Sequence, residues 1–99
     1  MFNKDMLDKL SDLKAKADES KERLGNIIIT EESGGGVIRV SMNGNRELKG
    51  IEINTDLSSM EKEELEDLLV LAFDKVMTKV NEINEQEVMS SASSLFPGM

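Results

Sequence analysis

Two closely spaced turn signals constrain the fold of this chain more than any other feature. Three glycines at 34–36 and the Asn43-Gly44 pair enclose the alternating run 37–42, and a long segment of helical pattern lies on either side. Glycine adopts the positive φ angles of tight turns without strain, and Asn-Gly favours a two-residue type I′ turn. The sequence therefore predicts a strand, turn, strand, turn unit in which Asn43-Gly44 forms the type I′ turn.

A triple glycine is also found in phosphate-binding loops, which continue into Lys-Ser/Thr at a helix N terminus. Here Gly36 leads instead into the run 37–40, which favours a strand. The glycines are therefore predicted to join two strands. Strand-like runs at 27–30, 37–42 and 47–54 predict a three-stranded antiparallel meander, in which Ile38, Val40 and Met42 share one face.

The first helical segment carries an apolar seam with spacings that alternate between four and three residues. The positions of this seam are Met6, Leu10, Leu13, Ala17, Ser20 and Leu24. The pattern predicts one helix over residues 3–24, with Gly25 as its C-terminal cap. We expect the seam to lie on the second helix, on the same helix of a second copy, or on both.

The second helical segment begins with Ser58 and Glu61, which have the spacing of a capping box. Its apolar positions recur at helical spacing to about Ser90 and are Leu65, Leu69, Ala72, Val76, Val80 and Ile83. Residues 91–99 lack periodicity, so we expect a single domain over 1–90 and a flexible tail over 91–99. The predicted class is α+β: a long N-terminal helix, a three-stranded antiparallel sheet and a long C-terminal helix.

Composition excludes several classes of function. The chain has no Cys and no His, which removes thiol nucleophiles, imidazole acid-base chemistry and the usual zinc ligands, so no catalytic residue, cofactor or small-molecule substrate is predicted. Carboxylates at Glu61, Glu64 and Asp67 are explained by the helix N terminus, and no metal site is predicted. No run approaches the ~20 apolar residues of a membrane span, and the N terminus does not resemble a signal peptide, which favours a cytoplasmic protein. With 38% hydrophobic residues and three Phe, the small core predicts self-association.

The net charge of −8 is unevenly distributed. Residues 1–24 carry six basic and six acidic groups, residues 25–57 three against five, and residues 58–99 three against nine. Binding to a polyanion therefore requires a local basic patch. Because Trp and Tyr are absent, base stacking is disfavoured, and contact with a duplex backbone is the remaining mode of nucleic-acid binding.

Basic residues flank the seam of the first helix on both sides. Lys9, Lys16 and Arg23 recur every seven residues on one side, and Lys14 and Lys21 lie on the other. An alternative is that Asp5–Lys9, Asp12–Lys16 and Glu19–Arg23 form i,i+4 ion pairs on a solvated helix, which the residues alone favour. Lys75 and Lys79 lie 14 or more residues past Glu61, hence about 21 Å or more along the second helix, beyond two Debye lengths at physiological salt.

The order of these elements and several local sequences resemble the YbaB/EbfC nucleoid-associated family. The similar pieces are residues 32–37, Asn43-Gly44, residues 51–53, residues 64–69, Ala72-Phe73 and residues 97–99. The resemblance implies a bacterial homodimer, cytoplasmic and in the nucleoid, whose helices project like the arms of tweezers and bind duplex DNA with little sequence preference. It assigns the contacts to basic residues of the arms: Lys9, Lys14, Lys16, Lys21, Arg23, Lys75 and Lys79.

Two other classes of function fit the same pattern. One is a dimeric scaffold in which the apolar seams and the acidic second helix bind proteins, for which the net charge of −8 is the best support. The other is a prefoldin-like holdase, since that architecture also consists of a helix, a β-hairpin and a helix. An enzyme ranks last because no acid-base or nucleophile constellation is present.

Overall fold

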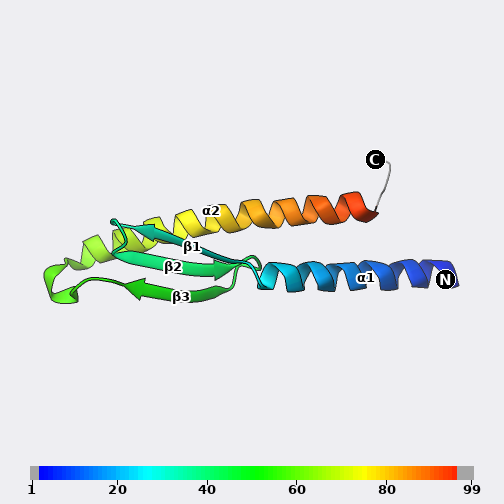
Figure 1. Ribbon diagram of the computed structural model, residues 1–99, viewed down its shortest axis with the longest axis horizontal. Helices are drawn as coiled ribbons and strands as arrows, with labels where there is room; N and C mark the ends of the chain where they lie inside the picture. Colours follow the sequence, from blue (N-terminus) through cyan, green and yellow to red (C-terminus); the bar gives the residue numbers. More distant parts are fainter. Residues whose placement is uncertain (1–2, 96–99) are drawn as a thin grey trace.

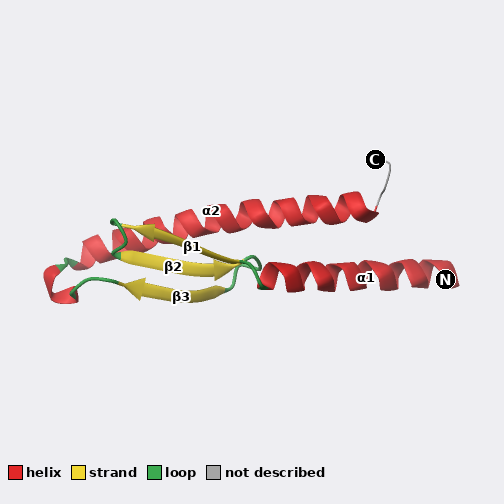
Figure 2. Ribbon diagram, viewed as in Figure 1, coloured by secondary structure: helices red, strands yellow, loops and turns green. Residues whose placement is uncertain are grey.

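A computed structural model of the chain describes residues 3–95 (Figure 1). The elements are α1 (Lys4–Gly25), β1 (Ile28–Ser33), β2 (Ile38–Asn43), β3 (Leu48–Ile53), a 3₁₀ helix η1 (Leu57–Ser59) and α2 (Lys62–Leu95). This order confirms the predicted α+β class. The molecule measures 66 × 24 × 21 Å, because both helices extend past the same end of the sheet (Figure 2).

Helix α1 has well-defined caps at both ends. Asn3 is the N-cap, and its Oδ1 accepts a hydrogen bond of 2.8 Å from the amide of Met6. Gly25 is the last helical residue, and the C-cap is Asn26, whose amide donates to the carbonyls of Glu22 and Arg23. The predicted helix is therefore confirmed to within a residue, whereas the predicted cap at Gly25 is displaced by one position.

The sheet is the predicted antiparallel meander with strand order β1-β2-β3. The three glycines at 34–36 join β1 to β2 with φ angles of 65°, 70° and 98°. These angles lie in the left-handed region that favours glycine, which explains the triple glycine as a turn. The interpretation of residues 34–36 as a connection between strands is confirmed.

The prediction of a type I′ turn at Asn43-Gly44 is wrong. Asn43 ends β2, its carbonyl accepts a hydrogen bond of 3.0 Å from Arg46, and the left-handed residue is Arg46, with φ 64°. The Asn43 side chain is buried and folds over the loop, because its Oδ1 accepts from the amides of Asn45 and Glu47 at 3.0 Å each. The connection between β2 and β3 is therefore a four-residue loop, 44–47, and not a two-residue turn.

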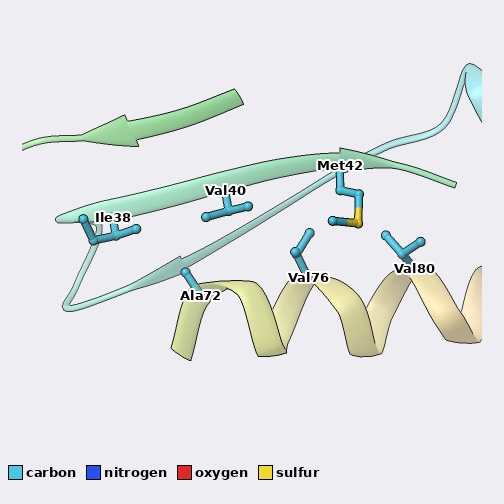
Figure 3. Close-up of a cluster of buried hydrophobic side chains, with 6 residues drawn as sticks. All are labelled: Ile38, Val40, Met42, Ala72, Val76 and Val80. Atoms are coloured by element: carbon cyan, nitrogen blue, oxygen red, sulfur yellow. The ribbon is translucent and has the colours of Figure 1, made fainter. Parts of the chain in front are cut away.

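The core lies between one face of β2 and one face of α2 (Figure 3). Its buried side chains are Ile38, Val40, Met42, Ala72, Val76 and Val80. Alternation along β2 places Ile38, Val40 and Met42 on one face, as predicted, and helical spacing along α2 turns Ala72, Val76 and Val80 toward them. Helix α2 packs against β1 and β2, and the Oγ of Ser33 in β1 donates a 2.6 Å hydrogen bond to the carbonyl of Leu68.

Strand β3 is left uncovered by this packing. Its register with β2 places Ile51 opposite Val40 and Ile53 opposite Ile38, so these side chains share the face on which the core lies. Nevertheless Ile51 is 43% exposed and Ile53 is 40% exposed. The sheet therefore has an apolar strip along its β3 edge that its own helix does not reach.

The predicted start and end of the second helix both require correction. Ser58 belongs to η1 rather than to a capping box, because Asp56 is the N-cap there and its carboxylate accepts from the amide of Ser58 at 3.0 Å. Helix α2 begins at Lys62 and runs to Leu95, beyond the predicted end at about Ser90. Residues 91–95, expected in a tail, are helical, and residues 96–99 lie outside the described residues.

Substitutions at Gly44 and Gly50 test how closely α1 approaches the sheet. A Cβ on Gly44 would lie 2.7 Å from the carbonyl oxygen of Leu24, whereas a Cβ on Gly50 meets nothing within 4 Å. Gly44→Ala is expected to lower the free energy of unfolding by about 1–3 kcal/mol. Gly50→Ala, the matched control in a strand, is expected to be neutral or stabilising by up to ~1 kcal/mol. Urea denaturation at one fixed protomer concentration measures both, and equal effects would contradict the close approach.

Candidate nucleic-acid interface

Helix α1 and residues 81–95 of α2 form an arm that projects beyond the sheet, with the two helices antiparallel (Figure 1). The base of the arm is fixed by hydrogen bonds to the β2–β3 loop. The amide of Gly44 donates to Leu24 at 2.9 Å, Asn45 Nδ2 donates to the carbonyl of Lys21 at 2.8 Å, and Asn84 Nδ2 donates to the carbonyl of Gly44 at 3.2 Å. One loop therefore holds both helices of the arm.

Glu87 of α2 makes the polar contacts that join the two helices above this loop. Its Oε1 accepts from the hydroxyl of Ser20 at 2.7 Å and from Nη2 and Nε of Arg23 at 2.5 and 3.1 Å. The Ser20 hydrogen bond, followed by those from Arg23, holds the pKa of Glu87 below its ordinary value of 4.5. The carboxylate is therefore ionised at neutral pH, and Arg23 is engaged within the molecule.

The charges of α1 are separated onto two sides of the helix. At 3.6 residues per turn, Lys9, Lys14, Lys16, Lys21 and Arg23 all flank the seam. The six acidic residues lie toward the opposite side and are Asp5, Asp8, Asp12, Asp18, Glu19 and Glu22. A helix with balanced total charge thus presents one basic face.

Two of the three ion pairs expected along α1 do not form in the described chain. Arg23 pairs with Glu87 rather than with Glu19, and no ion pair joins Asp5 to Lys9 within residues 3–95. Lys9, Lys14 and Lys21 are exposed, and Lys16 is half-buried. The interpretation of α1 as a helix neutralised by its own i,i+4 pairs is therefore not supported at these positions.

Lys75 and Lys79 lie apart from the α1 set. Lys75 Nζ donates a 3.0 Å hydrogen bond to the carbonyl of Glu32, near the end of β1 that is farther from α1. Both lysines line a shallow hollow with Glu31, Asp74 and Thr78. These two lysines thus belong to the part of α2 that covers the sheet, and the structure does not bring them together with the basic residues of α1.

Two basic residues that the sequence interpretation did not select lie at the base of the arm. The pKa of Glu47 is lowered first by the hydrogen bond from Asn43 and then by the charges of Lys49 and Lys21, which places both lysines near that carboxylate. Arg46 also lies in this loop, where its Nε donates to Asn81 Oδ1 at 2.8 Å. No sequence signal marked Lys49 and Arg46, because both positions belong to the predicted β-hairpin.

The described part of the chain offers neither a metal-binding cluster nor a helix that could span a membrane. Residues 3–95 contain no group of three Asp or Glu side chains placed to hold a metal ion. Neither α1 nor α2 contains, within that range, an apolar stretch sufficient to cross a bilayer.

The fold and the basic arm define a small α+β protein with projecting helices, and comparison with known proteins gives its family. Residues 1–95 match the YbaB/EbfC DNA-binding family, to which this chain belongs. A nucleoid-associated protein of Flavobacterium johnsoniae is 34% identical over 94 residues, covering 95% of this chain and 88% of that protein. A nucleoid-associated protein of Hahella chejuensis is 44% identical over 71 residues, which are 72% of this chain and 65% of that one.

The fold is similar to that of a protein of known structure. The crystal structure of an uncharacterized protein from Helicobacter pylori has a TM-score of 0.77 and 27% sequence identity. The match covers 91% of this chain and 97% of that chain. The predicted resemblance to the YbaB/EbfC family is confirmed.

The Glu87 contact predicts how the arm responds to charge. Because the pKa of Glu87 is lowered in the folded protein, its stabilising contact is present above pH 4.5 and is lost as the pH falls through the lowered pKa. Glu87→Gln is expected to widen the distribution of distances between the two helices at pH 7. Spin labels at Ser11→Cys and Ser93→Cys measure this distance, since the chain has no native Cys.

Glu85→Gln is the matched control, because Glu85 is exposed and lies one half-turn of the helix away from Glu87. It is expected to leave the distances unchanged at pH 7. Lowering the pH progressively below 4.5 is expected to widen the distribution in the native protein and in Glu85→Gln. Identical distributions for both variants at pH 7 would show that Glu87 does not join the helices.

Proposed function

We propose that this protein is a non-enzymatic, nucleoid-associated protein that binds duplex DNA through the basic face of α1, in the bacterial cytoplasm. The observation that supports this most is the separation of charge on α1, which gives an anionic molecule a cationic face on a projecting arm. The family and the names of its relatives support the same partner. Lys16 and Arg23 line a hollow with Glu87 of α2, and every member of the set except Lys16 is exposed.

The length of the basic face suits a stretch of duplex backbone. Lys9 and Arg23 are 14 residues apart, hence about 21 Å along the helix axis. Phosphates of one DNA strand advance by 3.4 Å per step along the duplex axis, so this face spans about six steps. Lys side chains bind phosphates as point charges and carry no information about sequence, so little sequence preference is expected.

Lys75 and Lys79 would form a second contact of the same kind. Their place over β1 means that they reach DNA only where the duplex also lies along the body of the molecule. The acidic groups Glu31 and Asp74 border these two lysines, which weakens their attraction for phosphate. We therefore expect the α1 set to contribute more to affinity than this pair.

We further propose that the protein is a homodimer formed along β3. This edge strand offers unpaired backbone groups beside the exposed Leu48, Ile51 and Ile53, and Phe73 and Met77 of α2 are only half-buried above the core. A second copy that covers this strip would complete the core and pair the edge, which isolated proteins otherwise protect with charge or bulges. Two arms on one body would then give the expected tweezers.

DNA binding is tested with charge-neutralising variants. A duplex titrated by fluorescence anisotropy from about 50 to 200 mM salt is expected to show affinity that falls steeply with salt. Lys14→Gln is expected to reduce the slope of log K against log salt by about 1–2 in a dimer, similarly for duplexes of different sequence. Lys62→Gln, at the far end of α2 and paired with Glu66, is the matched control and should leave the slope unchanged. Absence of binding by the native protein at 50 mM salt would refute the proposal.

The dimer is tested by placing a charge on the β3 strip. Ile51→Lys is expected to convert a particle of twice 11.0 kDa into one of 11.0 kDa at micromolar concentration, because burying an unpaired ammonium in an interface is strongly unfavourable. Val88→Lys, on an exposed apolar position of the arm, is expected to leave the dimer intact. Light scattering measures both masses. A native particle of 11.0 kDa would contradict the dimer.

A further inference from the structure

Within one protomer the apolar seam of α1 remains largely uncovered, so of the predicted alternatives the second helix alone does not cover it. Met6 is 46% exposed, Leu10 47% and Leu13 41%, and only Leu24 at the base is buried. The described residues of α2 that run beside it after Glu87 are mostly small or polar, with Ser90, Ser91, Ala92 and Ser93 among them. The large apolar residues just after Glu87 do not cover the seam either, because Val88 is 60% exposed and Met89 is 70% exposed.

An open groove follows from this mismatch. It has a volume of about 410 Å³ and lies between the two helices of the arm. Leu13, Ala17 and Leu24 line it from α1, and Val88 and Ala92 line it from α2. Lys16 and Lys21 stand at its sides, so the groove has an apolar floor and cationic borders.

The charges around the seam disfavour α1 of a second copy as the occupant. In heptad terms, Leu10, Ala17 and Leu24 are a positions and Met6, Leu13 and Ser20 are d positions. The flanking e and g positions from Lys9 onward are all basic: Lys9, Lys14, Lys16, Lys21 and Arg23. Two such helices would bring like charges together in parallel or antiparallel pairing, and like charges at these positions are destabilising.

The same borders favour a helix with carboxylates beside its apolar positions. The molecule already contains one such contact, since Glu87 reaches from the neighbouring helix to the g-position Arg23 and the d-position Ser20. Beyond Glu87, the described residues of α2 supply no further carboxylate. Lys9, Lys14 and Lys21, the lysines of the exposed flanks, therefore match acidic residues from outside the arm.

We propose that the groove between α1 and α2 binds an acidic amphipathic helix of a protein partner, with apolar a and d side chains on the seam and Glu or Asp at its e and g positions. The helix packs as a third member of the arm. Its carboxylates face Lys9, Lys14 and Lys21 as Glu87 faces Arg23. Because the lysines are those of the proposed DNA contact, the partner and duplex DNA compete for the arm, and this competition alone rests on the proposed function.

The test uses two synthetic peptides of about three heptads that share Leu at a and d. One has Glu at every e and g position, and the other has Lys there. Fluorescence anisotropy at about 100 mM salt is expected to show the Glu peptide binding at least tenfold more tightly than the Lys peptide. The double variant Lys14→Glu, Lys21→Glu is expected to reverse this preference, and circular dichroism checks that its exposed substitutions preserve the fold.

A variant of the apolar floor and a matched control complete the design. Leu13→Ser is expected to weaken binding of the Glu peptide at least tenfold, whereas Leu71→Ser, at an exposed apolar position of α2 over the sheet, is expected to leave it unchanged. Equal binding of both peptides, or no change of preference in the charge-reversed variant, would overturn the proposal. Growth of the native particle beyond a dimer that Leu13→Ser abolishes would identify a second copy as the occupant and would also overturn it.

Binding of the acidic helix and binding of DNA can be confirmed or refuted independently of each other. Binding of the Glu peptide without DNA binding would sustain this inference and remove the DNA contact. DNA binding without discrimination between the peptides would do the reverse. If both ligands bind, a duplex is expected to displace the labelled Glu peptide, and simultaneous binding would overturn the shared site.

Discussion

The packing of α2 across a single strand face determines nearly everything else in this molecule. Ile38, Val40 and Met42 project from β2 at every second residue, and Ala72, Val76 and Val80 meet them at every fourth. Because α2 lies over β1 and β2, the apolar side chains of β3 stay exposed beside the core. Because α2 continues past the end of the sheet, it also provides the second helix of the arm. The bare strip and the arm are thus two consequences of one helix position.

Electrostatics in this protein are decided by local arrangement and not by net charge. The chain carries −8 overall, yet five cations of α1 stand on one side of the helix and its acids on the other. The acidic start of α2 lies at the end of the sheet farther from the arm (Figure 1). At physiological ionic strength the Debye length is about 8 Å, so these acidic groups are screened from the arm. An acidic protein can therefore hold a cationic surface wherever helical periodicity separates the two signs.

The fold was largely predictable because its signals are local. Alternation in 37–42, the glycines at 34–36 and the two helical periodicities each specify their element directly. The wrong predictions concern positions where side-chain hydrogen bonds to backbone amides determine the local structure. The side-chain Oδ1 of Asn43 accepts hydrogen bonds from the amides of Asn45 and Glu47, so Gly44 does not enter a type I′ turn. The carboxylate of Asp56 caps η1, and Ser58 lies inside η1 instead of capping α2. Residues 91–95 continue the helix without an amphipathic pattern, so an end based on periodicity was predicted too early, at about Ser90.

The site was less predictable than the fold. Helical spacing identified the five basic residues beside the seam. It could not show that Arg23 pairs with Glu87, 64 positions away, or that Lys21 and Lys49 both lie near the carboxylate of Glu47. It also could not decide whether the seam lies on the second helix or on a second copy, and in one protomer Met6, Leu10 and Leu13 stay exposed. Contacts between elements depend on how far each helix extends, which no local pattern records. The assignment of Lys75 and Lys79 to the arms had the same weakness.

The contact between Glu87 and Arg23 lies close to the sheet, while α1 continues to Lys4, about 29 Å farther along its axis. This separation acts as a lever. A rotation of only 10° at the base moves the distal end of the helix by about 5 Å, which is roughly half the width of a DNA major groove. A small change in the contacts among Ser20, Arg23 and Glu87 therefore produces a much larger displacement of the distal end of α1. That displacement changes the distance between the ends of α1 and α2.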